Sequence, residues 1–127
     1  MLLKASQRYE AGLRPGSSYQ TDMTVYLERL KAAGKLLDLG QLEPSSFGIR
    51  LHPSEGESQR LEAGPFERGN DVLAGYIQIE ASSMTEAMKW ANRLPLPYGG
   101  TLENEIEVRQ LKEEVSASGA LYSNKKE

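Results

Sequence analysis

The clearest helical pattern in the chain begins at Tyr19, after a segment rich in turn-forming residues. Its apolar residues recur at intervals that place them on one face of a helix: Tyr19, Met23, Tyr26, Leu27 and Leu30. Ser17 or Ser18 can cap the start of this helix, and Gly34 can end it in a left-handed conformation. The pattern therefore predicts an amphipathic helix from about Tyr19 to Gly34.

A second helix is predicted to begin after Ser83. The run Ser83-Met84-Thr85-Glu86 has the spacing of a capping box, in which the side chains at both ends bind free amides of the first turn. An apolar stripe follows, made of Met84, Ala87, Met88 and Ala91. Pro95 cannot continue a helix, so we expect this one to end near Leu94.

Six other runs have the composition or the alternation of β-strands. They cover residues 2–6, 36–42, 47–52, 58–62, 73–80 and 105–111. The third and fourth runs flank Pro53-Ser54-Glu55-Gly56-Glu57 and predict a β-hairpin with a polar tip. Residues 7–17 are predicted to form a loop, and residues 112–127, which lose the pattern, a flexible C-terminal tail.

The resulting order, β-α-β-hairpin-β-α-β, predicts an α+β fold with both helices on one face of a mainly antiparallel sheet. This is the ferredoxin-like split βαβ arrangement with an inserted β-hairpin. In it the first strand is central, between the last strand and residues 73–80. The other face of the sheet then has to meet water or another sheet.

Composition narrows the classes of function. The 127 residues suit one domain, and a net charge of −3 without a basic stripe argues against nucleic-acid binding. With no cysteine and one histidine, disulfides, thiol catalysis and cysteine- or histidine-rich metal centres are excluded, and we predict no metal or cofactor. No apolar run reaches the roughly 20 residues that span a bilayer, and no signal peptide is predicted, so we expect a cytoplasmic protein without membrane contact.

A Gly-Pro pair precedes an aromatic residue in Gly64-Pro65-Phe66, shortly before the strand predicted over 73–80. Such a turn presents a ring from a shaped loop. Together with Ser45 and Ser46, which follow Pro44, Pro65 and Phe66 are candidate pocket-rim residues. Phe66 either anchors the loop in the core or lines a cavity.

At this point the chain resembles the YCII-related family and, within it, the branch named after an Asp-Gly-Pro-Phe (DGPF) motif. The matching segments are Met1-Leu2-Leu3-Lys4-Ala5-Ser6, Tyr9-Glu10-Ala11-Gly12, Ala33-Gly34, Pro44-Ser45-Ser46, Gly64-Pro65-Phe66, Ala74-Gly75, Glu86-Ala87 and Glu105-Ile106-Glu107-Val108-Arg109. They indicate a YCII-related, DGPF-like domain over residues 1–111, followed by the tail over 112–127. The resemblance implies a homodimer whose sheets pack face to face as a dimeric α+β barrel around a cavity. It also implies His/Asp chemistry in some branches and sigma-factor regulation in others.

The chain departs from the family pattern at two places. The aspartate of the motif is replaced by Ala63, and Glu62 lies one position earlier, on the opposite side of an extended chain. The histidine that YCII-type members carry near the start of the first helix has no counterpart in residues 21–26. We therefore do not expect an inherited His/Asp mechanism.

Strand alternation places five polar residues on the sheet face that the helices leave uncovered. They are Lys4, Tyr76, Gln78, Glu107 and Arg109. In a dimer cavity their charges would need pairing, and the cluster could bind an anionic or phenolic ligand. The alternative is that these residues only hydrate or brace the outer face of an antiparallel sheet. His52, at the predicted hairpin tip, is expected to be a solvated loop residue.

These observations favour a small homodimeric protein that binds a small anionic or aromatic ligand, or a protein partner, in or near the dimer cavity. The alternative is a cofactor-independent enzyme acting on a small aromatic or lactone-like compound, which Lys4, Glu107 or Arg109 would polarise. The sequence does not decide whether the protein is an enzyme.

Overall fold

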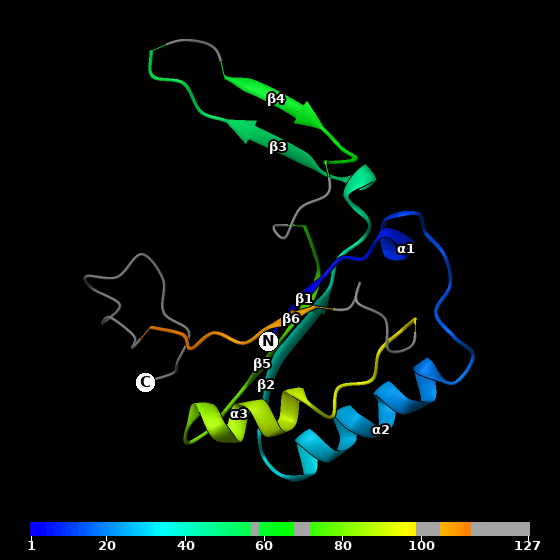
Figure 1. The fold of residues 1–127 in the computed structure, drawn as a ribbon. Helices are drawn as coiled ribbons and strands as arrows, with labels where there is room; N and C mark the ends of the chain where they lie inside the picture. The colour runs from blue at the N-terminus through cyan, green and yellow to red at the C-terminus, as the bar shows by residue number, and fades with distance from the viewer. Residues whose placement is uncertain (57–58, 68–71, 99–104, 113–127) are drawn as a thin grey trace.

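An antiparallel sheet of four strands forms the body of the protein (Figure 1). The computed structural model describes residues 1–56, 59–67, 72–98 and 105–112. The strand order is β2-β5-β1-β6, with bounds β1 Leu2–Lys4, β2 Leu36–Gln41, β5 Leu73–Ile79 and β6 Ile106–Glu107. The first strand thus lies between the last strand and β5, and the predicted ferredoxin-like α+β class is confirmed.

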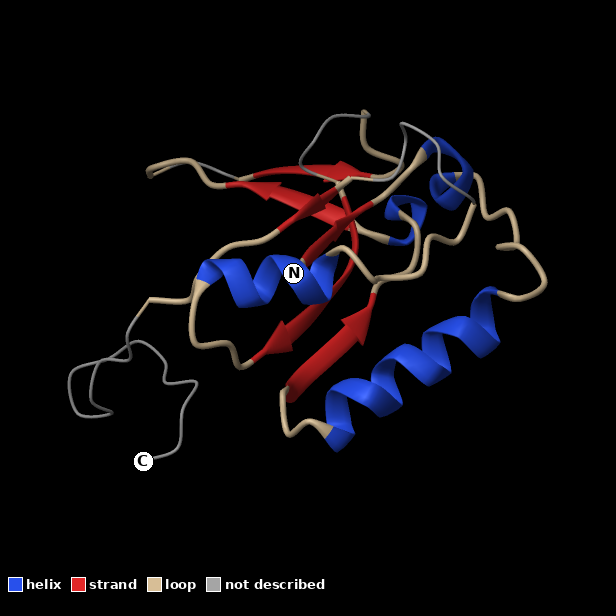
Figure 2. Cartoon of the chain, turned by 60° about the horizontal axis from the view of Figure 1, so that its bottom comes forward, coloured by secondary structure: helices blue, strands red, loops and turns tan. Residues whose placement is uncertain are grey.

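Two helices, α2 (Tyr19–Ala32) and α3 (Met84–Ala91), lie on the same side of this sheet (Figures 1 and 2). Both were predicted from their apolar stripes. A short helix, α1 (Gln7–Glu10), occupies part of the segment predicted as a loop. It forms because the Ser6 hydroxyl accepts a hydrogen bond from the Tyr9 amide at 3.1 Å, which satisfies one free amide of the first turn.

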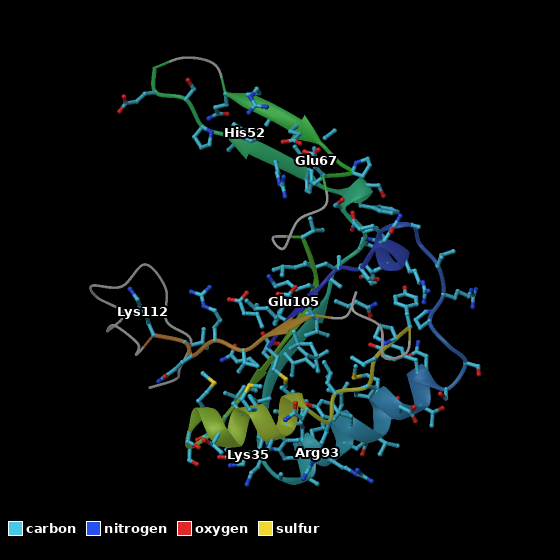
Figure 3. All side chains as sticks on the ribbon, in the orientation of Figure 1. Lys35, His52, Glu67, Arg93, Glu105 and Lys112 are labelled. Carbon is cyan, nitrogen blue, oxygen red and sulfur yellow. The ribbon has the colours of Figure 1, made fainter. Side chains whose placement is uncertain are left out.

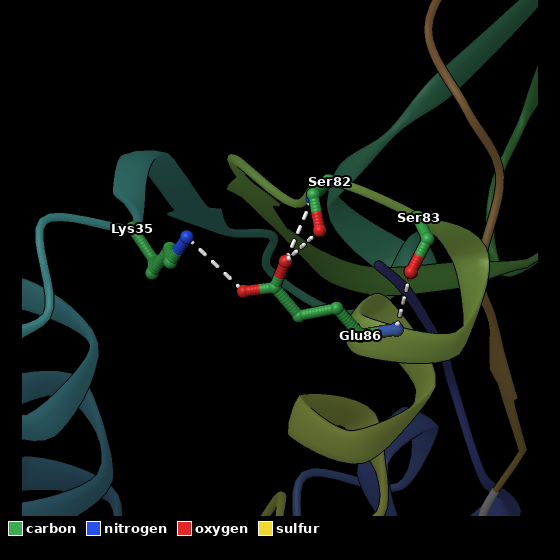
Figure 4. Close-up of polar contacts among 4 residues, drawn as sticks. All are labelled: Lys35, Ser82, Ser83 and Glu86. Atoms are coloured by element: carbon green, nitrogen blue, oxygen red, sulfur yellow. Dashed lines mark hydrogen bonds and ion pairs between the residues drawn. The ribbon is translucent and has the colours of Figure 1, made fainter.

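The helix ends differ in detail from the predicted caps. Ser18 stands at the N-cap of α2, but its side chain makes no capping hydrogen bond, whereas Gly34 adopts the expected positive φ of 71°. At α3 the Ser83 hydroxyl accepts from the Glu86 amide at 3.1 Å. The Glu86 carboxylate binds Ser82 and Lys35 (Figure 4), so only half of the predicted capping box forms.

The core lies between the sheet, α3 and the C-terminal half of α2. Its buried members are Met1, Tyr26, Leu30, Ile77, Ala91 and Leu94. The Tyr26 hydroxyl donates to the Trp90 carbonyl at 2.8 Å, and the two rings meet edge to face with centroids 6.2 Å apart. Burial raises the pKa of Tyr26 to about 12, so this hydroxyl remains a donor at any physiological pH.

The inserted hairpin, β3 (Ile49–His52) and β4 (Arg60–Ala63), extends away from the four-stranded sheet (Figures 1 and 2). Cross-strand pairing places Ile49, Leu51 and Leu61 on one face, and all three are largely exposed. A 3₁₀ turn, η1 (Ser45–Phe47), precedes the hairpin. Where the hairpin ends, the Gly64 amide donates to the Gly48 carbonyl at 2.9 Å.

Some sequence predictions need correction, and others lie outside the described residues. His52 is not in a loop but ends β3, with Nε2 3.0 Å from a Glu62 carboxylate oxygen. The last strand is two residues long instead of seven, because its partner β1 pairs with it only through Leu2 and Leu3. Ser58 and the predicted tail over 113–127 lie outside the described residues. In the described part of the chain, every helix is too short or too polar to cross a membrane.

Candidate functional site

A cavity of about 580 Å³ lies on the helix side of the sheet. It is bounded by the first part of α2, by the strands β1, β2 and β5, and by the segments that follow α1 and α3. The apolar residues that line it include Leu3, Met23, Leu27, Leu39, Ile77 and Leu96. A concave site of this size with an apolar lining has the ordinary properties of a small-molecule pocket.

The cavity exists because α2 packs on the sheet through only one of its halves. Tyr26 and Leu30 are buried, whereas Met23 and Tyr19, about one and two turns before Tyr26, are only partly buried and line the cavity. The apolar stripe of the helix is therefore divided. Its second half lies in the core. Tyr19 and Met23, in its first half, border a space that no described residue fills, and Met23 also packs against the edge of the core.

Exposed apolar side chains gather around the same space. Leu13, Leu39, Phe47 and Leu96 all line the cavity, and they keep between 38% and 74% of their surface exposed. Single exposed leucines are common on protein surfaces, but a concave cluster of them marks an interaction site. A bound apolar molecule would cover this surface.

Beside the apolar residues, four tyrosines are among the described residues that line the cavity. Tyr76 lies on β5, and the other three, Tyr9, Tyr19 and Tyr98, lie outside the sheet. The Tyr98 hydroxyl donates to the Leu13 carbonyl at 2.8 Å, and the Tyr9 hydroxyl donates to the Leu42 carbonyl. Burial raises the pKa of all three phenols, and Tyr9 and Tyr98 add to the rise at Tyr19, which places these groups near one another. All three are therefore neutral at pH 7.

On the opposite face of the sheet, three of the five predicted ligand-binding residues come together. Lys4 Nζ lies 3.2 Å from Glu107 Oε1, and Arg109 Nη1 lies 3.2 Å from Glu107 Oε2. The bond from Lys4 lowers the pKa of Glu107, and Arg109 acts in the same direction. Lys4 is nearly covered, with 11% of its side chain exposed, so this pair braces the ends of β1 and β6.

The other two predicted residues, Tyr76 and Gln78, lie further along β5 and face β2. Gln78 pairs with Asp38, and the Tyr76 hydroxyl lies 3.5 Å from Asp38 Oδ2. Asp38 was not predicted from the sequence, because a single acid within an apolar strand carries no motif. Lys4 and Tyr76 also contribute to the cavity lining, so the two candidate sites share part of the sheet.

The four predicted rim residues surround a hydrogen-bonded junction. Ser45 Oγ donates to a Glu10 carboxylate oxygen and accepts from the Phe66 amide at 2.9 Å, and the Ser45 amide donates to Glu10 at 2.8 Å. Ser45 is buried, while Ser46 and Pro65 are exposed. The guanidinium of Arg50 stacks 4.1 Å above the Phe66 ring.

A rim role for these four residues stays a prediction. Pro44 and Phe47, which flank Ser45 and Ser46, do line the cavity. Glu10 was not predicted as a site residue, although it lies in a segment that matches the family. A carboxylate 35 residues from its serine partner leaves no local pattern in the sequence.

The remaining acid–base candidate, His52, lies on the hairpin, while Glu105 lies at the start of the β6 segment beside the sheet (Figure 3). The bond to His52 lowers the pKa of Glu62, the acid adjacent to the position of the motif's aspartate. Among the described residues, no group of three or more histidine, aspartate or glutamate side chains is placed to hold a metal ion.

Comparison with known proteins identifies a family and a relative. The family model described as the YCII-related domain matches residues 3–113, which is most of the chain. A protein of Rhizobium meliloti (strain 1021), "Uncharacterized protein R00369", is 30% identical over 73 residues, or 58% of each chain. The present chain thus spans less than two thirds of that relative.

Proposed function

The chain belongs to the YCII-related family, and we propose that it is a small-molecule-binding protein whose ligand occupies the cavity between α2 and the sheet. One observation carries this proposal. Tyr19 and Met23, in the first half of α2, border about 580 Å³ of space and stay only partly buried, although Met23 also packs against the edge of the core. An apolar molecule that fills this space would bury apolar surface that stays partly exposed in the folded protein, and this burial would favour binding.

We also propose that the protein acts as a homodimer, through the sheet face that carries no helices. The helices of the described residues cover one face of the sheet, and Tyr76 stays 38% exposed on the other. A face-to-face packing of two such sheets would form the dimeric α+β barrel that the sequence predicts. Membership of the DGPF branch likewise stays a prediction.

The sheet-face cluster is proposed to serve this interface before it serves a ligand. Glu107 offsets part of the charge of Lys4 and Arg109, which weakens the attraction of the cluster for an anion. General acid–base catalysis at this cluster would need a group whose pKa lies near neutrality. The bond from Lys4 lowers the pKa of Glu107 instead, so this carboxylate does not suit that role, and we place binding ahead of the alternative, a cofactor-independent enzyme.

The binding proposal is tested with N-phenyl-1-naphthylamine, a neutral apolar dye that fluoresces when it leaves water. We expect saturable binding of one dye per chain and a rise of several degrees in the melting temperature at saturating dye. Met23→Trp should fill the cavity and lower the affinity for the dye at least tenfold.

Val25→Trp is the matched control, because Val25 lies on the same helix but 43% exposed and is not among the cavity-lining residues that the structure describes. It should bind the dye like the parent. Dye binding that is absent in the parent, or equal in the parent and Met23→Trp, would contradict the proposed cavity function.

A further inference from the structure

The charged residues that line the cavity are balanced in sign. Among the described lining residues, the positively charged ones are Lys4 and Arg14, and the negatively charged ones are Glu43 and Glu105. Lys4 already pairs with Glu107, and the other three are largely exposed to water. The lining therefore offers an ion no net attraction, and moving an unpaired charge into an apolar cavity is strongly unfavourable.

The phenol groups of the cavity offer neutral hydrogen bonds. They differ in whether the hydroxyl hydrogen is already bonded within the protein. Tyr98 uses its hydrogen on the Leu13 carbonyl, so its oxygen can only accept a further bond. Tyr19 has no hydrogen-bond partner for its hydroxyl in the described part of the chain, and its side chain lines the same cavity. Tyr19 can therefore donate.

An unused phenol hydrogen in a half-buried position is costly unless water or a ligand accepts it. Tyr19 lies at the first turn of α2 and lines the same cavity as Met23 and Leu27, which follow it on the helix. A ligand that fills the apolar part of the cavity can therefore meet a donor on Tyr19 and an acceptor on Tyr98.

We propose that the cavity selects neutral, largely apolar molecules that carry a carbonyl-type acceptor and an N–H or O–H donor, with Tyr19 donating to the acceptor and Tyr98 accepting from the donor. Carboxamides and neutral lactam-like compounds have this chemistry. The inference rests on the proposed binding function and adds the class of ligand to it. It excludes carboxylates of the same shape.

Three probes of one shape test the inference: naphthalene, 2-naphthamide and 2-naphthoate, titrated at pH 7.5 and followed by calorimetry or chemical shifts. We expect 2-naphthamide to bind at least tenfold more tightly than 2-naphthoate. Tyr19→Phe should weaken 2-naphthamide roughly 3- to 10-fold, the range of one neutral hydrogen bond, and leave naphthalene unchanged.

Tyr26→Phe is the matched control, because the Tyr26 hydroxyl bonds to Trp90 in the core and lies outside the described cavity lining. It should bind 2-naphthamide like the parent. Tighter binding of 2-naphthoate, or an equal loss for all three probes in Tyr19→Phe, would overturn the ligand class while leaving the binding function in place. Failure of all three probes to bind would overturn the binding function itself.

Discussion

Position 64 requires glycine because of a close contact, and not because of an unusual backbone angle. A Cβ at this position would lie 1.7 Å from the Ser45 carbonyl oxygen, and Ser45 is fixed by its bonds to Glu10 and Phe66. In the sequence, the Gly-Pro-Phe turn indicated a bend. In the structure, its glycine is required because the neighbouring backbone of Ser45 leaves no room for a Cβ.

Gly64→Ala should therefore destabilise the protein by about 1–3 kcal/mol or more, as overpacking against fixed atoms does. Urea unfolding measures the change. Gly16→Ala is the control, since its Cβ would meet Pro97 at an ordinary 3.9 Å, and it should unfold close to the parent. Equal midpoints for all three proteins would contradict the proposed contact.

Glu86 makes stability depend on pH. Hydrogen bonds from the Ser82 amide and hydroxyl, and then from Lys35, lower the pKa of Glu86 from 4.5 to about 2 (Figure 4). A group with a lowered pKa in the folded state contributes stability above its unfolded pKa and loses it as the pH falls through the folded value. Its contribution is complete at pH 7 and declines between about pH 5 and pH 2.

Glu86→Gln should therefore lower the melting temperature at pH 7, and its difference from the parent should shrink as the pH is lowered towards 2. Circular dichroism melts at pH 7, 4.5 and 3 follow both trends. Glu28→Gln, on the exposed side of α2, should show no such trend. A difference that stays constant with pH would show that the carboxylate charge is not what stabilises this site.

At the scale of elements, α2 is divided between a packed half and a half that borders the cavity. Amides in a packed helical segment open with higher free energy than amides in a segment with little buried contact. We expect peptides covering residues 19–25 to exchange hydrogen faster than those covering 26–32. Saturation with N-phenyl-1-naphthylamine should slow exchange in the first segment. Equal protection of both segments without the dye would contradict the divided packing.

Sequence periodicity predicted the elements that are long and strongly patterned. Both main helices and the order of the strands follow from it, because apolar residues at helical or alternating spacing have to face the core. It missed α1, whose capping serine is followed by a segment rich in glycine and proline. It extended the last strand because alternation continues past Glu107, although a strand ends where its neighbour stops pairing.

The candidate site was harder to predict than the fold. Tyr19, Met23 and Leu27 have the same spacing as core residues, so the sequence alone assigns the whole stripe to the core. Whether the first half of a helix touches the sheet depends on how the helix is tilted, which is a tertiary property. On the uncovered sheet face, alternation alone was enough to place Lys4, Glu107 and Arg109 together.

At the scale of the whole molecule, we predict a dimer with about twice the chain mass of 14.1 kDa in sedimentation experiments at micromolar concentration. A stable interface of this kind buries roughly 1,600 Å² in total. Tyr76→Lys removes an exposed ring from the uncovered face and should shift the protein towards monomer. Glu28→Lys changes charge on the helix side and should not. A parent protein that is monomeric at tens of micromolar would refute the dimer.

The first and last residues of the hairpin segment lie next to each other. Gly48 and Gly64 are joined by a backbone hydrogen bond, so the chain leaves the body and returns to it at nearly one point. A segment closed in this way can gain or lose residues at its far end without changing the course of the chain on either side, and the entropy of loop closure grows only slowly with its length. The body of the protein is therefore insulated from length variation in this segment, which makes the far end of the hairpin a natural place for insertions or for grafting a foreign peptide.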